Sequence, residues 1–137
     1  MEQTAKFKLN QWEKTDRIQM EDFNADNAKL ETALSKCGNC RMVTSSYTGN
    51  GKYGSITPNQ VTFDKAPDSV FVSGGTSLLL AFRGINQAYL LTGSSVLTLP
   101  ATWSGNGVSW YHSENPAHQM NTQNAVYTYC ALIRADT

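Results

Sequence analysis

The sequence has no net charge, because 11 basic residues balance 11 acidic residues, and it contains only two histidines and three cysteines. Without a basic excess, electrostatics do not favour a nucleic acid or an anionic membrane as partner. No apolar stretch approaches the roughly 20 residues of a membrane-spanning helix, and the charged N-terminus has no apolar signal-peptide core. We therefore expect a chain made in the reducing cytosol, without membrane insertion and without a disulfide-dense scaffold.

The sequence also has few residues of the types that catalyse reactions. The glycine-rich part after residue 40 contains only four carboxylates, all in predicted turns or near the end of the sequence: Asp64, Asp68, Glu114 and Asp136. A glycoside hydrolase needs two carboxylates a few ångströms apart, and no G-x-S-x-G or phosphate-binding loop is present. We expect no enzyme and no cofactor, and a small cell-wall hydrolase is the weakest alternative.

One short motif, CGNC at residues 37–40, carries two of the three cysteines. Zinc would need two further ligands, and the remaining candidates are His112, His118 and Cys130. A thioredoxin-like dithiol requires a βαβ frame, whereas here a helix is predicted before the motif and a strand after it. We interpret the motif as a joint without metal, in which Asn39-Cys40 leads into the second domain. Disulfides between chains outside the cell stay an alternative.

Composition divides the sequence into two parts. Residues 1–40 hold seven of the 11 acidic residues, whereas all four prolines and nine of the ten glycines follow Gly38. The first part is typical of a short arm and a helix, and residues 41–137 are typical of strands joined by tight turns. We therefore predict an N-terminal arm and stalk helix at 1–40 and a β head at 41–137.

The stretch TDRIQMEDFNADNAKLETALSK predicts a helix over residues 16–37. Thr15 or Asp16 is a suitable N-cap, and Gly38 follows where a left-handed C-cap favours glycine. Apolar residues recur with heptad a and d spacing, interrupted by one asparagine: Met20, Phe23, Asn27, Leu30, Leu34 and Cys37. Fewer than three heptads cannot hold a coiled coil alone. The stripe either packs on the chain's own β domain or forms a short oligomer stalk.

Strands are expected at QVTFD, SVFVSG, SLLLAFRG, AYLLTG, SVLTLP and AVYTYCALIR. Seven or eight short strands in under a hundred residues predict an antiparallel β-sandwich. The last strand is apolar at both alternating sets of positions, which predicts cover on both faces. So small a sheet domain leaves apolar surface that oligomerisation would help to bury.

Two Asn-Gly pairs predict hairpin turns. Asn50-Gly51 would place Thr48 opposite Tyr53. Asn106-Gly107 would place Trp103 opposite Trp110. Because opposed residues share a face of the sheet, this register predicts a buried face with Trp103, Val108 and Trp110, and a wet face with Thr102, Ser104, Ser109 and Tyr111.

Two long stretches make the sequence recognisable. LNQWEKTDRIQMEDFNADNAKLETAL, followed by CGNCRMVTSSYTGNGKYG, resembles the start of tail-fibre proteins of phages and prophages of Gram-positive gut bacteria, clostridia and relatives. LTLPATWSGNGVSWYHSENPAHQMNTQNAVYTYCALI is similar to their end. The most specific residues are Trp12, Asp22, Phe23, Asn24, Ala25, Asp26 and Asn27. The resemblance implies a homotrimeric virion protein, with its N-terminal arm toward other phage tail proteins and a β-rich head toward the host.

The leading hypothesis is therefore a tail-fibre or receptor-binding protein that adheres to a bacterial cell-surface glycan, and the alternative is a structural tail or baseplate component without its own ligand. Sugars need aromatic faces together with nearby amides or hydroxyls. Candidate ligand-binding residues are Tyr111, His112, Asn115, His118, Gln119 and Asn121, joined by Lys52, Tyr53, Arg83, Asn86 and Gln87 from other turns.

Overall fold

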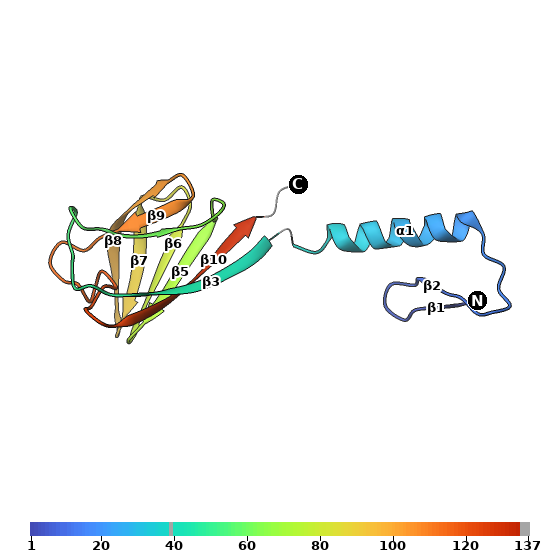
Figure 1. The fold of residues 1–137 in the computed structure, drawn as a ribbon, viewed down its shortest axis with the longest axis horizontal. Coiled ribbons are helices and arrows are strands. Elements are labelled where there is room, and N and C mark those ends of the chain that lie inside the picture. Colours follow the sequence, from blue (N-terminus) through green and yellow to red (C-terminus); the bar gives the residue numbers. More distant parts are fainter. Residues whose placement is uncertain (39, 135–137) are drawn as a thin grey trace. The chain divides into compact units, whose positions relative to one another are not determined.

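The computed structural model describes residues 1–38 and 40–134 and has two compact units, Met1–Asn39 and Cys40–Thr137. The division falls one residue before the predicted domain boundary. We call the second unit the head (Figure 1). The predicted role of Asn39 in the joint and the position of Asp136 lie outside the described residues.

The first unit contains a two-stranded hairpin and one helix. Strands β1 (Glu2–Gln3) and β2 (Asn10–Gln11) pair antiparallel, and helix α1 spans Met20–Ser35. The Asp26 carboxylate accepts a hydrogen bond of 3.0 Å from the backbone N–H of Asn10. The rings of Trp12 and Phe23 stack with centroids 5.8 Å apart. Asp26 and Phe23 of the helix thus hold the hairpin and Trp12, which follows it, against α1.

Both predicted caps of the helix were wrong. The N-cap is Gln19, whose side chain makes no capping hydrogen bond. Asp16 is engaged elsewhere, because its carboxylate accepts a 2.9 Å hydrogen bond from the N–H of Glu13 in a separate turn. At the other end, Lys36 is the C-cap in a right-handed conformation, and its N–H and that of Cys37 donate to carbonyls three residues back. These bonds satisfy the last turn without a left-handed glycine.

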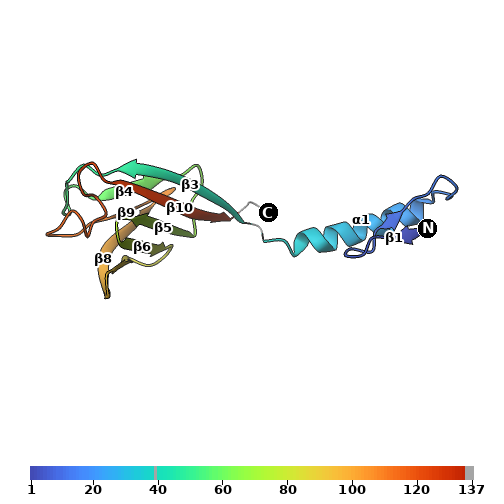
Figure 2. The same cartoon turned by 90° about the horizontal axis from the view of Figure 1, so that it is seen from below.

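The head is mainly β, as predicted, and its strands pair antiparallel throughout. The order across the sheet is β3-β10-β5-β6-β7-β8-β9-β4, with bounds β3 Cys40–Thr48, β4 Asn59–Thr62, β5 Ser69–Gly74, β6 Ser77–Phe82, β7 Gln87–Thr92, β8 Ser95–Ser104, β9 Gly107–Trp110 and β10 Val126–Arg134. A sandwich of two separate sheets was expected. Instead one sheet curls on itself (Figures 1 and 2), because residues Ser95–Pro100 of β8 pair with β7 and Ala101–Ser104 pair with β9.

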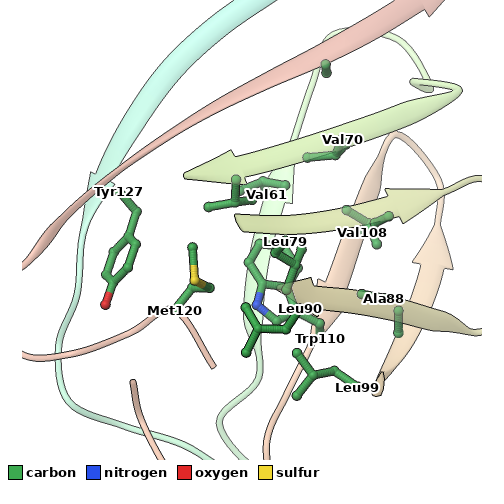
Figure 3. Packing of buried hydrophobic residues seen from close by; sticks show 14 of the residues in the cluster. Val61, Val70, Leu79, Ala88, Leu90, Leu99, Val108, Trp110, Met120 and Tyr127 are labelled. Atoms are coloured by element: carbon green, nitrogen blue, oxygen red, sulfur yellow. The ribbon is translucent and has the colours of Figure 1, made fainter. Parts of the chain in front are cut away.

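The concave face of the curled sheet encloses the core. Alternate residues of each strand point inward, as the two-residue period of a strand requires. Trp110, Leu79, Leu90 and Leu99 are almost completely buried and converge with Val61 from the far edge strand (Figure 3). Burying each such side chain contributes about 1.5–3 kcal/mol, so the curl is held mainly by apolar contacts between its two halves.

Strand β10 is covered on one face only within the chain. Tyr127, Ala131 and Ile133 are buried in the core. On the alternate positions, Val126 is 62% and Leu132 is 36% exposed. The expectation of cover on both faces is therefore not met by this single chain.

The two predicted hairpins had different outcomes. The second hairpin exists, but its turn is Gly105-Asn106, where Gly105 has the positive φ of 56° that a glycine-first turn requires. Trp103 consequently pairs with Val108, not with Trp110. The partner of Trp103 is thus two residues away from the predicted one, and a shift of two residues keeps every side chain on the same face of the sheet. The faces are therefore as predicted, with Val108 and Trp110 buried and Trp103 half-buried.

The Asn50-Gly51 hairpin was wrong. Thr48 does not face Tyr53, because β3 pairs along its whole length with β10, where Thr48 lies opposite Val126. After β3 the chain instead enters a long loop.

Candidate ligand-binding site

Two loops lie against each other at one end of the head: residues 49–58, between β3 and β4, and residues 111–125, between β9 and β10. Backbone hydrogen bonds join them, including Gly49 N–H to the Ala125 carbonyl at 2.7 Å and Gly51 N–H to the Asn121 carbonyl at 2.8 Å. A Cβ atom at Gly49 would lie 2.0 Å from the Thr122 carbonyl oxygen. Only glycine permits this close approach.

The side chain of Gln119 ties the two loops together from inside. It is completely buried. Its Oε1 accepts hydrogen bonds from the N–H of Gly54 at 3.0 Å and of His112 at 2.9 Å, while its Nε2 donates to the Thr57 carbonyl at 2.8 Å. One carboxamide therefore satisfies three backbone groups on two different loops.

A second buried amide, Asn121, fixes the start of the first loop. It is 4% exposed, and its Oδ1 accepts from the N–H of Asn50 while its Nδ2 donates to the Lys52 carbonyl at 2.8 Å. Gln119 and Asn121 were predicted to bind a ligand. The structure places both side chains in the interior of the head, where their amides position the loops.

Between these amides, Met120 is fully buried with a φ of 58°, which is unusual for a residue other than glycine. Its carbonyl accepts hydrogen bonds from the Tyr47 hydroxyl at 2.7 Å and from Asn59 Nδ2 at 3.1 Å. Burial, and to a lesser degree the neighbouring Tyr127, raise the pKa of Tyr47 far above its ordinary value. Tyr47 therefore stays a neutral hydrogen-bond donor that holds this strained residue.

A cavity of about 380 Å³ opens between the two loops. It is lined by Tyr53, Gly54, Ser55, Ile56, Tyr111 and Ser113. Tyr53 is 47% exposed and Ile56 is 94% exposed. Two phenol rings, one aliphatic side chain and two hydroxyls thus face solvent together, and no charged side chain is among the lining residues.

The structure brings two of the predicted ligand-binding residues, Tyr53 and Tyr111, into this cavity. His112 lies in the chain between the lining residues Tyr111 and Ser113, and its ring centroid is 5.0 Å from that of His118. His112 Nδ1 accepts from the backbone N–H groups of Glu114 and Asn115, both at 3.1 Å, so it shapes the turn. Neither histidine is among the residues that line the cavity.

The side chain of Asn115 also acts locally, since its Oδ1 accepts from the Ala117 N–H at 2.8 Å. Asn86 is exposed on the β6–β7 loop and does not line the cavity. Arg83 is used structurally, because its Nε donates to the Pro67 carbonyl at 2.6 Å and its guanidinium lies 5.2 Å from the Trp103 ring centroid.

Sequence reasoning missed part of the site. Ser55, Ile56 and Ser113 line the cavity but were not predicted. Ile56 carried a usable signal, since it is a single large aliphatic residue in a turn-rich stretch between Gly54 and Pro58. An aliphatic residue without an alternating pattern around it has no strand face to occupy, and such a residue in a loop stays exposed.

The predicted oligomerisation stripe of α1 is exposed in the single chain. Met20 is 75%, Phe23 50%, Leu30 40% and Leu34 65% exposed. Asn27 and Cys37 are also exposed. The β1–β2 hairpin covers a different side of the helix, where the half-buried residues are Asp22, Asp26, Lys29 and Ala33. Trp12, directly after β2, stacks on Phe23 of the stripe, whereas Met20, Leu30 and Leu34 stay exposed.

In residues 1–38 and 40–134, no three His, Cys, Asp or Glu side chains lie close enough together to hold a metal ion. Cys37 and Cys40 are exposed free thiols, and Cys130 is half-buried. Within the same described ranges, no helix has the length and apolar character needed to cross a membrane. Near the head's edge, a hydrogen bond from Arg41 lowers the pKa of the exposed Asp64.

The sequence matches no protein-family model, and searches for similar curated proteins and for similar solved structures return no match.

Proposed function

We propose that this chain is a tail-fibre or receptor-binding protein of a phage particle, and that its head adheres to a neutral glycan on a bacterial surface. The observation that carries the proposal is the uncharged cavity of Tyr53, Ile56 and Tyr111, whose two walls are tied together by the buried Gln119. The resemblance of the sequence to tail fibres supplies the biological setting.

The chemistry of the cavity suits a sugar. The exposed ring of Tyr53 and the half-buried ring of Tyr111 offer apolar faces for the C–H side of a pyranose. The hydroxyls of Ser55 and Ser113 can exchange hydrogen bonds with sugar hydroxyls. The lining has no positively charged side chain that could pair with an anionic sugar. A neutral sugar therefore loses less hydration free energy on entering the cavity than an anionic sugar would. Pre-positioned loops also reduce the ordering cost of binding.

A single cavity of this size binds weakly, and assembly supplies the remaining strength. The exposed stripe of α1 supports a homotrimeric stalk, in which Asn27 would fix the register. Three heads on one stalk bind a repetitive surface with an avidity above that of each site. The β1–β2 hairpin lies mainly on another side of the helix, and it is then available to other tail proteins.

A glycan array probed with the full chain tests the proposal. We expect binding to neutral surface glycans, reduced at least about tenfold, equivalent to 1.4 kcal/mol, by Tyr111→Ala or Tyr53→Ala at an unchanged melting temperature. The matched control is Ile85→Ala, which shortens a side chain that is 40% exposed outside the cavity and should bind as the wild type does.

Three results would contradict the proposal. Absence of binding both to the array and to isolated host envelopes would favour the structural tail component. Release of sugar fragments from purified cell wall would favour the hydrolase. Binding that Tyr53→Ala and Tyr111→Ala leave unchanged would place the ligand elsewhere on the head.

A further inference from the structure

A second, smaller cavity lies at the base of the loop formed by residues 49–58. Its volume is about 190 Å³, and it is lined by Tyr47, Thr48, Asn50, Pro58, Asn59, Gln60 and Asn121. Four of these residues carry carboxamides, and all seven side chains are uncharged. We call this space the amide cavity, and the cavity lined by Tyr53, Ile56 and Tyr111 the first cavity.

The two cavities share one loop and therefore lie close to each other. Tyr53 of the first cavity follows Asn50 of the amide cavity by three residues, which span at most about 11 Å. On the return of the loop, Ile56 precedes Pro58 by two residues, which span at most about 7 Å. A disaccharide or trisaccharide is long enough to reach from one cavity to the other.

Some amides of the second cavity are already used by the fold. Asn121 Nδ2 donates a hydrogen bond to Asn50 Oδ1 at 2.7 Å. Asn59 Nδ2 donates to the carbonyls of Gln119 and Met120, at 2.8 and 3.1 Å. These bonds fix the walls of the amide cavity before any ligand binds, which lowers the ordering cost of binding.

Other polar groups of the amide cavity have no hydrogen-bond partner among residues 1–38 and 40–134. They are Asn50 Nδ2, the carboxamide of Gln60 and the hydroxyl of Thr48, all on exposed residues. Asn50 Oδ1 accepts from the N–H of Lys52 at 3.0 Å as well as from Asn121, so its amide group is held in place. The cavity thus offers a positioned donor at Asn50, and both a donor and an acceptor at Gln60.

We propose that the amide cavity binds the acetamido group of an N-acetylated amino sugar, while a neighbouring ring of the same glycan lies on Tyr53 and Tyr111. The acetamido carbonyl accepts from Asn50 Nδ2, its N–H donates to Gln60 Oε1, and its methyl group packs on the Pro58 ring. A hydroxyl in place of the acetamido group would leave the methyl contact and one of these hydrogen bonds unmade. The inference rests on the proposed function and specifies the class of neutral glycan.

A glycan array of matched pairs tests the inference on the full chain. Each pair holds a neutral disaccharide or trisaccharide of glucose or galactose, and the same glycan with 2-acetamido groups in place of the 2-hydroxyls. We expect the acetylated member of at least one pair to reach half-saturation at a concentration at least about tenfold lower. The reason is that the plain sugar leaves polar groups of the site unpaired.

Two variants examine the assigned contacts. Asn50→Asp removes the unused Nδ2 donor and keeps the oxygen that accepts the two hydrogen bonds within the fold. Gln60→Ala removes an exposed carboxamide, and it decides the test if Asn50→Asp lowers the melting temperature. Each should reduce the preference for the acetylated glycan by about threefold or more. The matched control is Gln87→Ala, the same chemical change at an exposed position outside both cavities, which should keep the preference.

Equal binding of both members in every pair would overturn the inference, as would a preference that Asn50→Asp and Gln60→Ala both leave unchanged. An array without binding to any member would overturn it as well. Failure of the proposed function is distinguishable. Lost preference with binding that still depends on Tyr111 rejects the inference alone, whereas binding that Tyr53→Ala and Tyr111→Ala leave unchanged contradicts the proposed function.

Discussion

Replacing Gln119 by methionine separates a loop-positioning role from a ligand-binding role. The substitution keeps the side-chain length but removes the carboxamide that joins Gly54, His112 and Thr57. Each of the three hydrogen bonds contributes about 1 kcal/mol net, so Gln119→Met should lower the free energy of unfolding by about 3 kcal/mol. For a domain of this size, that corresponds to a fall in melting temperature of about 12–24 °C.

Urea unfolding followed by tryptophan fluorescence measures this loss, and amide hydrogen exchange locates it. Faster exchange is expected first at the N–H group of His112, which loses the Gln119 Oε1 atom as its acceptor, whereas the N–H of Gly54 keeps the His112 carbonyl at 2.9 Å. Gln123→Met, at an exposed position in the same loop, is the matched control and should change stability by less than about 0.5 kcal/mol. A loss below about 1 kcal/mol in Gln119→Met, combined with abolished glycan binding, would refute the reasoning and return Gln119 to the ligand contacts.

Three further predictions concern the core, the buried tyrosine and the cysteines. Trp110→Ala should cost about 3–5 kcal/mol in urea unfolding, and a cost under 1 kcal/mol would contradict its complete burial. Because burial raises the pKa of Tyr47, the free energy that its neutral phenol contributes to folding is present below about pH 10 and is lost as the pH rises above that value. The Tyr47→Phe variant should therefore lose less of its free energy of unfolding between about pH 10 and 12 than the wild type does. The Tyr53→Phe variant, changed at an exposed position, should follow the wild type. Cys37→Ser with Cys40→Ser should leave melting temperature and native mass unchanged, and unfolding or a stoichiometric metal in the purified wild type would revive the zinc alternative.

The local part of the fold was predictable because it depends on neighbouring residues. The strands from β5 to β8 and β10 lie close to where alternation and turn residues placed them. The faces of the Trp103 and Trp110 hairpin were also correct, since a shift of the turn from Asn106-Gly107 to Gly105-Asn106 preserves the two-residue period.

Pairing between distant segments was not predictable in the same way. Asn50-Gly51 has a favoured turn sequence, yet β3 pairs with a strand that follows β9 by a long loop, because Tyr47 and Val43 complete the core from that position. One sequence offers no local signal for such a partner. The curl of the sheet, through which one sheet encloses the core in place of the two expected sheets, depends on the same long-range contacts.

The candidate site was predictable only in its composition. Tyr111 and Gln119 both lie in a polar stretch with aromatic residues, and nothing in their sequence neighbours distinguishes a ring that lines the cavity from a buried amide. The difference depends on which loop covers each residue, and that loop comes from the other end of the head sequence. Burial of a polar residue is decided by distant contacts, so its role follows only from the structure.

The long pairing of β3 with β10 makes the head suitable for insertion into another protein. Cys40 lies directly opposite Arg134, so the described part of the head starts and finishes on neighbouring residues, about 5 Å apart as in any antiparallel pair. The head could therefore be inserted into a surface loop of an unrelated carrier protein, with Cys40 and Arg134 joined to the two ends of the opened loop. Insertions of this kind are tolerated where the two joined ends lie close together. The cavity lies beyond the opposite end of β3, so such a graft would present it away from the carrier.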